Sequence, residues 1–234
     1  NTRLGWYSET VTTATNAAAD IEEVTPTQKA DGGWNVATPF PFIQGTDCCG
    51  RVVRVGDGVD SAMIGRRVLV RACMRPHGFG SMENVWMGSD FDGAFAEYVK
   101  VPAAGHLMRV PEGWSEAEAA CFRVGAVTAF HSLVHRAALK PREVLLVHGA
   151  SGGVGVCCLQ LAKAAGCEVV ACAGTDAKAK RLMELGADKT INYVEKDFVK
   201  EVYAMYGKPT RRGAGTHLGL DVVVNYTGGD TWVK

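Results

Sequence analysis

The chain has 234 residues, 47% of them apolar, and its 25 basic and 25 acidic side chains give a formal net charge of zero. This composition is typical of a soluble globular protein with one or two domains. The balanced charge gives no indication of binding to nucleic acid or to a membrane surface, and no apolar stretch reaches the length of a membrane span. Because the sequence starts at Asn1 rather than Met, it does not tell whether a targeting signal precedes it.

The eight cysteines form no CxxC pair. Five of them fall within predicted helices or strands, where we expect them to pack as small apolar side chains. These five are Cys121, Cys157, Cys158, Cys167 and Cys172. The pattern indicates a reducing compartment, the cytoplasm, rather than a protein stabilised by disulfides.

The N-terminal half is predicted to be a small irregular β barrel with two long loops. Residues 8–36 are rich in Thr, Ala and Asp with little periodicity, and form the first loop, either functional or without a role. From Pro39 onward glycines alternate with short β-prone runs, which is typical of such a barrel. The predicted strands cover residues 51–55, 65–70 and 93–101. Residues 72–90 are predicted to be the second loop.

The C-terminal half is predicted to alternate strands and helices. A capping box at residues 115–118, Ser-Glu-Ala-Glu, starts a helical region that Gly125 either breaks or continues, and that ends before Pro141. The predicted strands after it are 144–148, 168–173, 189–192 and 221–226. The predicted helices are 153–165, 176–185 and 195–206, of which the last two end at Gly186 and Gly207. A complete doubly wound sheet has six strands, so we expect the chain to lack a C-terminal part.

A glycine turn follows the first of these strands. Four glycines between residues 149 and 155 lie between a Val/Leu run and a stretch with apolar residues at helical spacing. Glycines allow the backbone to approach a pyrophosphate, and the helix start offers it free N–H groups. This predicts a dinucleotide site; the alternative is a parallel α/β domain without a nucleotide. The residues assigned to the site are Gly149, Ser151, Gly152, Gly153 and Val154.

The end of the second strand favours NADPH over NADH. NAD sites usually place Asp or Glu there to bind the ribose hydroxyls, whereas this chain has Ala173, Gly174 and Thr175. Small residues leave room for a 2′-phosphate, and Lys178 in the next helix is placed to neutralise it. The alternative is that Lys178 is an ordinary solvated lysine.

Short motifs along the chain carry a family resemblance. They are Arg3-Leu-Gly-Trp-Tyr7, Gly45-Thr-Asp47, Ala96-Glu-Tyr-Val99, Val127-Thr-Ala129, Gly149-Ala-Ser-Gly-Gly-Val-Gly155, Leu185-Gly-Ala-Asp188 and Ile191-Asn-Tyr193. With them the chain resembles the medium-chain dehydrogenase/reductases, and within these the zinc-free quinone-oxidoreductase-like branch. The resemblance implies an α/β protein with a GroES-like β-barrel catalytic domain over residues 1–118 and a Rossmann domain with a doubly wound parallel sheet over 119–234. Family members extend further at both ends, so both domains are expected to be partial.

The resemblance also has a consequence for metal binding. Zinc-dependent members have Gly-His-Glu where this chain has Gly45-Thr46-Asp47, and their later cysteine ligand corresponds to Val124, with Cys121 three residues too early. Zinc requires a tetrahedral set of Cys, His or carboxylate ligands, so no metal site is expected. Without a Lewis acid, a substrate with its own electron sink is easier to reduce. The resemblance therefore implies NADPH-dependent hydride transfer to a quinone or an α,β-unsaturated carbonyl, whose oxygen needs only hydrogen-bond donors.

Residue roles follow from matching positions. Gly174, Thr175, Lys178 and Tyr193 match residues around the 2′-phosphate in NADPH-using relatives, and Asn225 ends the strand that passes the adenine and ribose. We expect these five residues, with the glycine turn, to bind NADP.

Two further residues are the catalytic candidates. Thr128 matches a threonine beside the nicotinamide, or is bonded to its own helix; Tyr7 matches a tyrosine of the substrate cleft, where it donates to the carbonyl or only packs. His131 and His135 have a spacing that metal ligands use, but a solvated helix face explains them better.

Two other functions remain open from the sequence: a zinc-type alcohol dehydrogenase and a non-catalytic NADPH-binding protein. Metal analysis would identify a zinc-type alcohol dehydrogenase. Cofactor binding without turnover would identify a non-catalytic NADPH-binding protein. The expected partner is a small carbonyl or quinone substrate. Some family members pair through edge strands of the cofactor domain, so a homodimer is one assembly that the resemblance allows.

Overall fold

The computed structural model describes residues 43–75, 77, 84–103, 105–208, 219–228 and 231. The chain divides into two compact units, Asn1–Arg123 and Val124–Lys234. Tyr7, the predicted loop 8–36 and part of the predicted loop 72–90 lie outside the described residues. The domain boundary after residue 118 stays a prediction.

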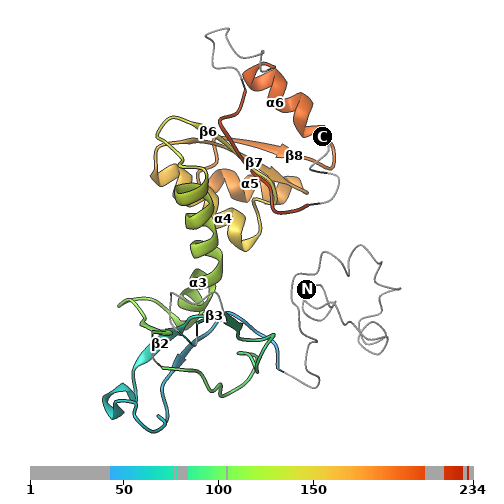
Figure 1. The fold of residues 1–234 in the computed structure, drawn as a ribbon. Coiled ribbons are helices and arrows are strands. Elements are labelled where there is room, and N and C mark those ends of the chain that lie inside the picture. Colours follow the sequence, from blue (N-terminus) through green and yellow to red (C-terminus); the bar gives the residue numbers. More distant parts are fainter. Residues whose placement is uncertain are drawn as a thin grey trace, which may run out of the picture. The chain divides into compact units, whose positions relative to one another are not determined.

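The first unit contains short antiparallel strands, as the glycine-rich pattern predicts. Three strands form one sheet in the order β1-β2-β5 and two form a second sheet, β3-β4. Figure 1 labels β2 of the first sheet and β3 of the second. The strands are β1 (Cys49–Arg51), β2 (Arg67–Val70), β3 (Cys73–Met74), β4 (Val85–Trp86) and β5 (Leu107–Arg109), and a 3₁₀ turn, η2, covers Ser61–Met63. Strands β3 and β4 fall in the stretch predicted as a loop, where Met74 and Met87 are buried with Val70.

The prediction of a strand over residues 93–101 is wrong. Three consecutive N–H groups, those of residues 93, 94 and 95, donate to carbonyls of the segment 43–45. In a strand, successive backbone groups point to opposite sides, so this bonding needs a bent backbone. Phe95 and Tyr98 are accordingly exposed rather than packed in a sheet.

The second unit is built on a four-stranded parallel sheet in the order β8-β7-β6-β9. Its strands are β6 (Val144–Val147), β7 (Glu168–Ala173), β8 (Lys189–Asn192) and β9 (Val222–Val224), and its connecting helices are α4 (Gly153–Ala164), α5 (Asp176–Glu184) and α6 (Phe198–Tyr206). In chain order the strands lie 3-2-1-4, the arrangement of the doubly wound dinucleotide-binding sheet. The predicted Rossmann topology is confirmed for these four strands.

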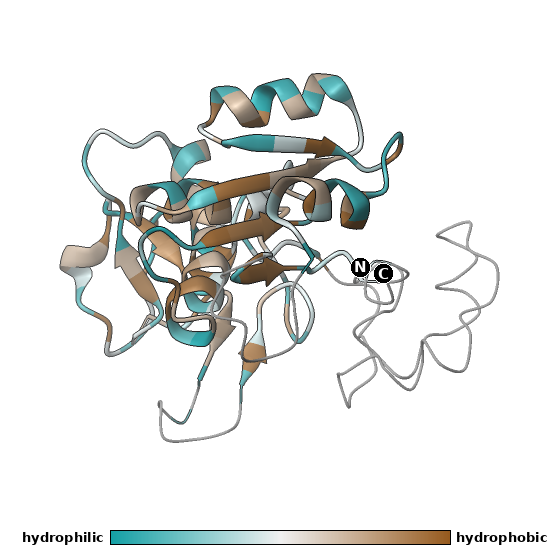
Figure 2. Cartoon of the chain, turned by 90° about the horizontal axis from the view of Figure 1, so that it is seen from above, coloured by the Kyte–Doolittle hydropathy of each residue, from teal (hydrophilic) through white to brown (hydrophobic). Residues whose placement is uncertain are grey.

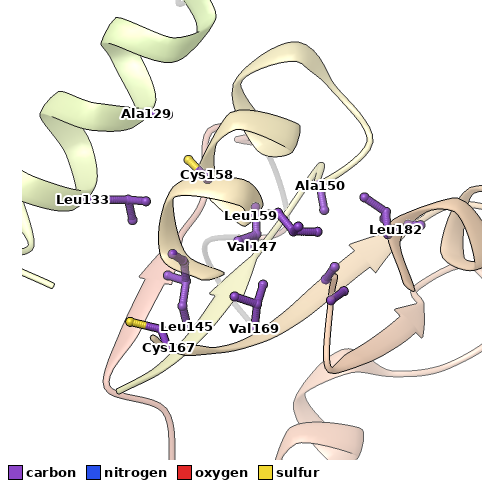
Figure 3. Close-up of a cluster of buried hydrophobic side chains, with 14 of the residues drawn as sticks. Ala129, Leu133, Leu145, Val147, Ala150, Cys158, Leu159, Cys167, Val169 and Leu182 are labelled. Atoms are coloured by element: carbon purple, nitrogen blue, oxygen red, sulfur yellow. The ribbon is translucent and has the colours of Figure 1, made fainter. Parts of the chain in front are cut away.

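Helices cover both faces of this sheet because its strands are apolar on both sides. On β6, Leu145 and Val147 pack with α4 and α5, whereas Leu146 packs on the other face with Val202 of α6. Figure 3 shows the first of these cores, with Cys158 and Leu159 of α4 over the strands. Figure 2 shows apolar colour concentrated in the strands and hydrophilic bands along the helices. The sheet is thus held by packing on both faces, and this packing also holds in place the strand ends beside which a site can form.

Helix ends follow local side-chain chemistry. Gly186 and Gly207 have positive φ values of 106° and 78° and follow their helices as predicted. Helix α6 begins at Phe198 rather than at the predicted residue 195, because the carboxylate of Asp197 accepts from the N–H groups of the next turn. Side-chain caps thus set the start of α5, at Thr175, and of α6, at Asp197.

Helix α3 (Glu116–Phe130) continues through Gly125 without a break and is followed by a π-helical turn, η3 (His131–Arg136). The predicted capping box is confirmed: Ser115 Oγ accepts from the Glu118 N–H at 3.2 Å, and Glu118 accepts from the Ser115 N–H at 2.9 Å. Bonds to Ser115 hold the pKa of the Glu118 carboxyl below its usual value. Cys121 on this helix is exposed, so the expectation that it packs in the core is wrong.

Candidate functional site

The site lies where the sheet reverses its winding. Strands β6 and β9 are neighbours, but the chain leaves β6 toward β7 and reaches β9 by way of α6 on the opposite face. Ligands of such sheets bind outside the carboxyl ends of the strands at this switch point. Here β6 ends in the glycine turn and β9 ends in residues 225–228.

The glycine turn is shaped for close backbone approach. Gly149 has a φ of 61° and its carbonyl accepts from the Gly152 N–H at 2.9 Å, which closes the turn before α4. A Cβ on Gly153 would meet nothing within 4 Å, whereas one on Gly155 would lie 2.5 Å from the Gly149 oxygen. Gly155 is thus needed for packing, and Gly153 leaves open space in front of the helix start.

The turn therefore fits a pyrophosphate. The first N–H groups of α4 have no carbonyl partner within the helix, and Gly153, its first residue, has open space where a side chain would lie. Ser151 is exposed at the same turn, whereas Val154 packs partly into the core. Val154 is expected to contribute its backbone rather than its side chain.

Helix α3 packs closely against this turn. A Cβ on Gly125 would lie 3.4 Å from the Gly153 oxygen and 3.7 Å from Cys157 Sγ. Thr128, one turn further along, is exposed, and its carbonyl accepts from Ser132 Oγ at 2.8 Å. The structure thus places Thr128 on the helix that borders the glycine turn, and its role beside a nicotinamide stays a prediction.

The turn after β9 lies against the glycine turn. A Cβ on Gly149 would be 3.0 Å from Thr227 Cγ2, and the Tyr226 hydroxyl lies 3.4 Å from the Gly149 oxygen. Burial raises the pKa of the Tyr226 hydroxyl, which therefore remains a donor. The Asn225 amide is engaged within its own turn, donating to Thr231 Oγ1 at 2.9 Å and accepting from the Thr227 N–H at 3.1 Å. Asn225 thus shapes this wall of the site.

The end of β7 brings four predicted residues to one edge. A Cβ on Gly174 would lie 2.9 Å from the Tyr193 hydroxyl oxygen, because the Tyr193 N–H donates to the Ala173 carbonyl at 3.1 Å. Thr175 caps α5 by accepting from the Lys178 N–H at 3.3 Å. Lys178 is exposed in the first turn of that helix. The Tyr193 hydroxyl thus lies next to Gly174, which has no side chain, and α5, whose first turn contains Lys178, starts two residues further along the chain.

Two residues near the site, Asp176 and His148, are not among those predicted from the sequence. Asp176, the first residue of α5, accepts a hydrogen bond of 2.9 Å from the side-chain amide of Asn192 at the end of β8. His148, just before the glycine turn, is buried, and its ring meets Phe198 edge-on at 4.3 Å between centroids. Burial lowers the pKa of His148 and favours the neutral imidazole. Their sequence signal is weak because neither belongs to the glycine pattern.

Thr46 and Val124, which the resemblance implies stand at the zinc-ligand positions of zinc-dependent members, are both among the described residues. Among the described residues, no three His, Cys, Asp or Glu side chains gather as a metal-binding group. Within the same part of the chain, no helix has the length and apolar character needed to cross a membrane.

Comparison with known proteins covers both units. The model for the alcohol dehydrogenase GroES-like domain matches residues 9–112, and that for zinc-binding dehydrogenase matches residues 153–234. An alcohol dehydrogenase of Geobacillus stearothermophilus is 33% identical over 212 residues, 84% of this chain and 58% of that protein. The quinone oxidoreductase of Homo sapiens is 29% identical over 186 residues, 79% of this chain and 48% of that protein.

A solved structure agrees with these matches. The quinone oxidoreductase of Pseudomonas syringae pv. Tomato DC3000 superposes with a TM-score of 0.67 at 28% identity, covering 87% of this chain and 54% of that one. The chain spans about half the length of the curated relatives it matches. The GroES-like domain and the Rossmann-type sheet expected from the sequence are both confirmed.

Proposed function

The chain belongs to the medium-chain dehydrogenase/reductase superfamily, and from this premise we propose that it is part of an NADPH-dependent reductase of quinones or α,β-unsaturated carbonyls that works without zinc. The observation that carries the cofactor preference is the contact between Gly174 and the Tyr193 hydroxyl at the end of β7.

NADPH differs from NADH by a 2′-phosphate on the adenosine ribose. Residues 173–175 supply no carboxylate to bind a free 2′-hydroxyl, and Lys178 and Tyr193 supply a cation and a donor to the same edge. An ammonium and a hydroxyl form charge-assisted hydrogen bonds with a phosphate. The same groups interact more weakly with the neutral ribose of NADH, and this difference in binding supports NADPH as the cofactor.

The substrate class follows from the groups available to stabilise charge. When bound, the nicotinamide supplies the hydride. In a quinone or enone, the resulting negative charge moves to a conjugated oxygen, which hydrogen-bond donors stabilise without a metal. We propose Tyr7 and Thr128 as the residues that border the reacting groups, with Tyr7 donating to that oxygen. The Geobacillus relative favours alcohol oxidation as the second candidate, but Thr46 and Val124 are poor zinc ligands.

One experiment separates these functions. The purified protein is incubated with NADPH and a panel of quinones, enones and simple ketones, and cofactor oxidation is followed by absorbance while bound metal is measured by mass spectrometry. The proposal expects turnover of quinones or enones at substoichiometric zinc. Turnover limited to simple ketones with one zinc per chain would overturn it, and cofactor binding without any turnover would favour a non-catalytic NADPH-binding protein.

The free thiols support one further proposal. All eight cysteines are unpaired, and three of them, Cys158, Cys167 and Cys172, are buried. Unpaired thiols in this number are typical of a reducing compartment, so we place the protein in the cytoplasm.

A further inference from the structure

The side-chain amide of Asn192 is fixed from two sides. Its Oδ1 accepts from the Val194 N–H at 3.2 Å, and its Nδ2 donates to Asp176 Oδ1 at 2.9 Å. A backbone N–H only donates and an ionised carboxylate only accepts, so this is the one orientation of the amide that satisfies both partners. Asn192 therefore links the end of β8 to the first turn of α5.

This link lies at the end of β7, at the edge that is proposed to bind the adenosine ribose. Asn192 is paired in register with Ala173, the last residue of β7, and Tyr193 follows it against Gly174. Asp176 lies two residues before Lys178 in the first turn of α5. The edge thus holds a carboxylate as well as the cation.

A carboxylate at this edge opposes a 2′-phosphate. It repels a phosphate dianion and accepts a hydrogen bond from a free 2′-hydroxyl, which is how acidic residues select NADH. The bond from Asn192 occupies one oxygen of Asp176 and holds the group in a single orientation, so its capacity to accept from a ribose is reduced.

We propose that Asn192 is a cofactor-specificity residue, which favours NADPH by binding the Asp176 carboxylate and withholding it from the ribose. The proposal rests on the proposed NADPH site. It differs from that site in assigning specificity to a residue that itself need not touch the cofactor, and it makes Asn192 a positioning residue.

A double-mutant cycle tests the coupling. Dissociation constants for NADPH and NADH are measured by fluorescence titration on the wild type, Asn192→Ala, Asp176→Asn and the double variant. Removing the amide frees the carboxylate, so Asn192→Ala lowers the preference for NADPH about fivefold, the size of one hydrogen bond. Asp176→Asn raises that preference by a similar factor. In the Asp176→Asn background, Asn192→Ala has no further effect, which controls for the lost bond to Val194.

The outcomes separate this inference from the proposed function. A wild type without preference for NADPH contradicts the proposed cofactor, while the change in the ratio between variants still measures the coupling. An unchanged ratio in Asn192→Ala, or an equal change in the Asp176→Asn background, overturns the inference. Thermal melting of all four proteins shows that each is folded, and binding of neither dinucleotide by the folded wild type overturns both proposals.

Discussion

The hydroxyl of Tyr193 lies against the backbone of Gly174, at the point where β7 ends. A Cβ on Gly174 would be 2.9 Å from that hydroxyl oxygen and 3.3 Å from the ring carbon that bears it. Because Tyr193 follows β8 and its N–H donates to the Ala173 carbonyl, the pairing of two strands sets this contact. A hydroxyl group thus lies at the end of the second strand of the sheet, where NAD-binding proteins usually have a carboxylate.

Lys178 is expected to supply most of the charge at this edge. Lys178→Ala should weaken NADPH binding about tenfold, the loss of one charge-assisted contact, and leave NADH binding unchanged. Lys180→Ala is the matched control, because Lys180 is also exposed on α5 but lies beyond its first residues. Fluorescence titration with both cofactors measures the effect. Equal losses for NADPH and NADH, or equal effects of the two variants, would contradict a phosphate contact.

Gly153→Ala separates binding from folding. A Cβ here meets nothing within 4 Å, and alanine is favoured over glycine in a helix by up to about 1 kcal/mol, so the melting temperature should hold or rise. The same methyl group fills the open space through which a pyrophosphate approaches, so binding of NADPH and NADH should both fall by at least about tenfold.

Gly155→Ala is expected to have the opposite effect on stability from Gly153→Ala. Its Cβ would lie 2.5 Å from the Gly149 oxygen and 2.6 Å from Ala150 Cα, so the fold itself should be destabilised. Thermal melting and cofactor titration of both variants test the pair. Wild-type binding by Gly153→Ala would show that no pyrophosphate approaches this turn.

Much of this architecture is predictable from the sequence, because its signals are local. The glycine turn, the capping box at Ser115 and the helix-ending Gly186 each depend on residues a few positions apart. The irregular pairing of residues 93–95 with 43–45 was not predicted, since it depends on a bent backbone rather than on alternation. The Asn192–Asp176 bond spans 16 positions and requires the register of β7 and β8, which no motif encodes.

His148 should make folding sensitive to pH. Burial lowers the pKa of this imidazole, so the folded form stays neutral while the unfolded form takes up a proton below its usual pKa of about 6.5. The free energy of unfolding should therefore fall as the pH drops from 7 to 5, by at most about 1.4 kcal/mol per pH unit from this group. Carboxyls with a lowered pKa, such as Glu168 beside Lys189 and Tyr206, also stabilise the folded protein. They lose this stabilisation as the pH falls further, through their own lowered pKa.

Urea unfolding at pH 5, 6 and 7 measures this dependence in the wild type and in His148→Leu. The leucine variant has no group at this position to titrate, so its stability should be flatter over the same range. An identical slope in both proteins would show that another group is responsible.

Asp188, the last residue of the Leu-Gly-Ala-Asp motif, is expected to act in folding rather than in binding. Its Oδ2 accepts from the N–H of fully buried Val169 at 2.7 Å, and both oxygens accept from Lys163 Nζ at 2.8 Å. Burial raises the pKa of this carboxyl, but the bonds from Lys163 and Val169 outweigh it, so the pKa is lowered overall.

Asp188→Ala leaves the Val169 N–H without its acceptor and should cost about 2 kcal/mol of unfolding free energy. Exposed Glu195 provides the control, since Glu195→Ala should change stability by less than about 0.5 kcal/mol. Denaturant titration compares the two variants, and a loss for Asp188→Ala no larger than for Glu195→Ala would contradict the structural role.

Gly174, Lys178 and Tyr193 are proposed to form the edge that selects NADPH. The most direct test is titration of the purified wild-type protein with NADPH and with NADH, followed by fluorescence or calorimetry. We expect NADPH to bind at least about tenfold tighter than NADH, the value of one charge-assisted phosphate contact. Equal affinities, or tighter binding of NADH, would contradict it.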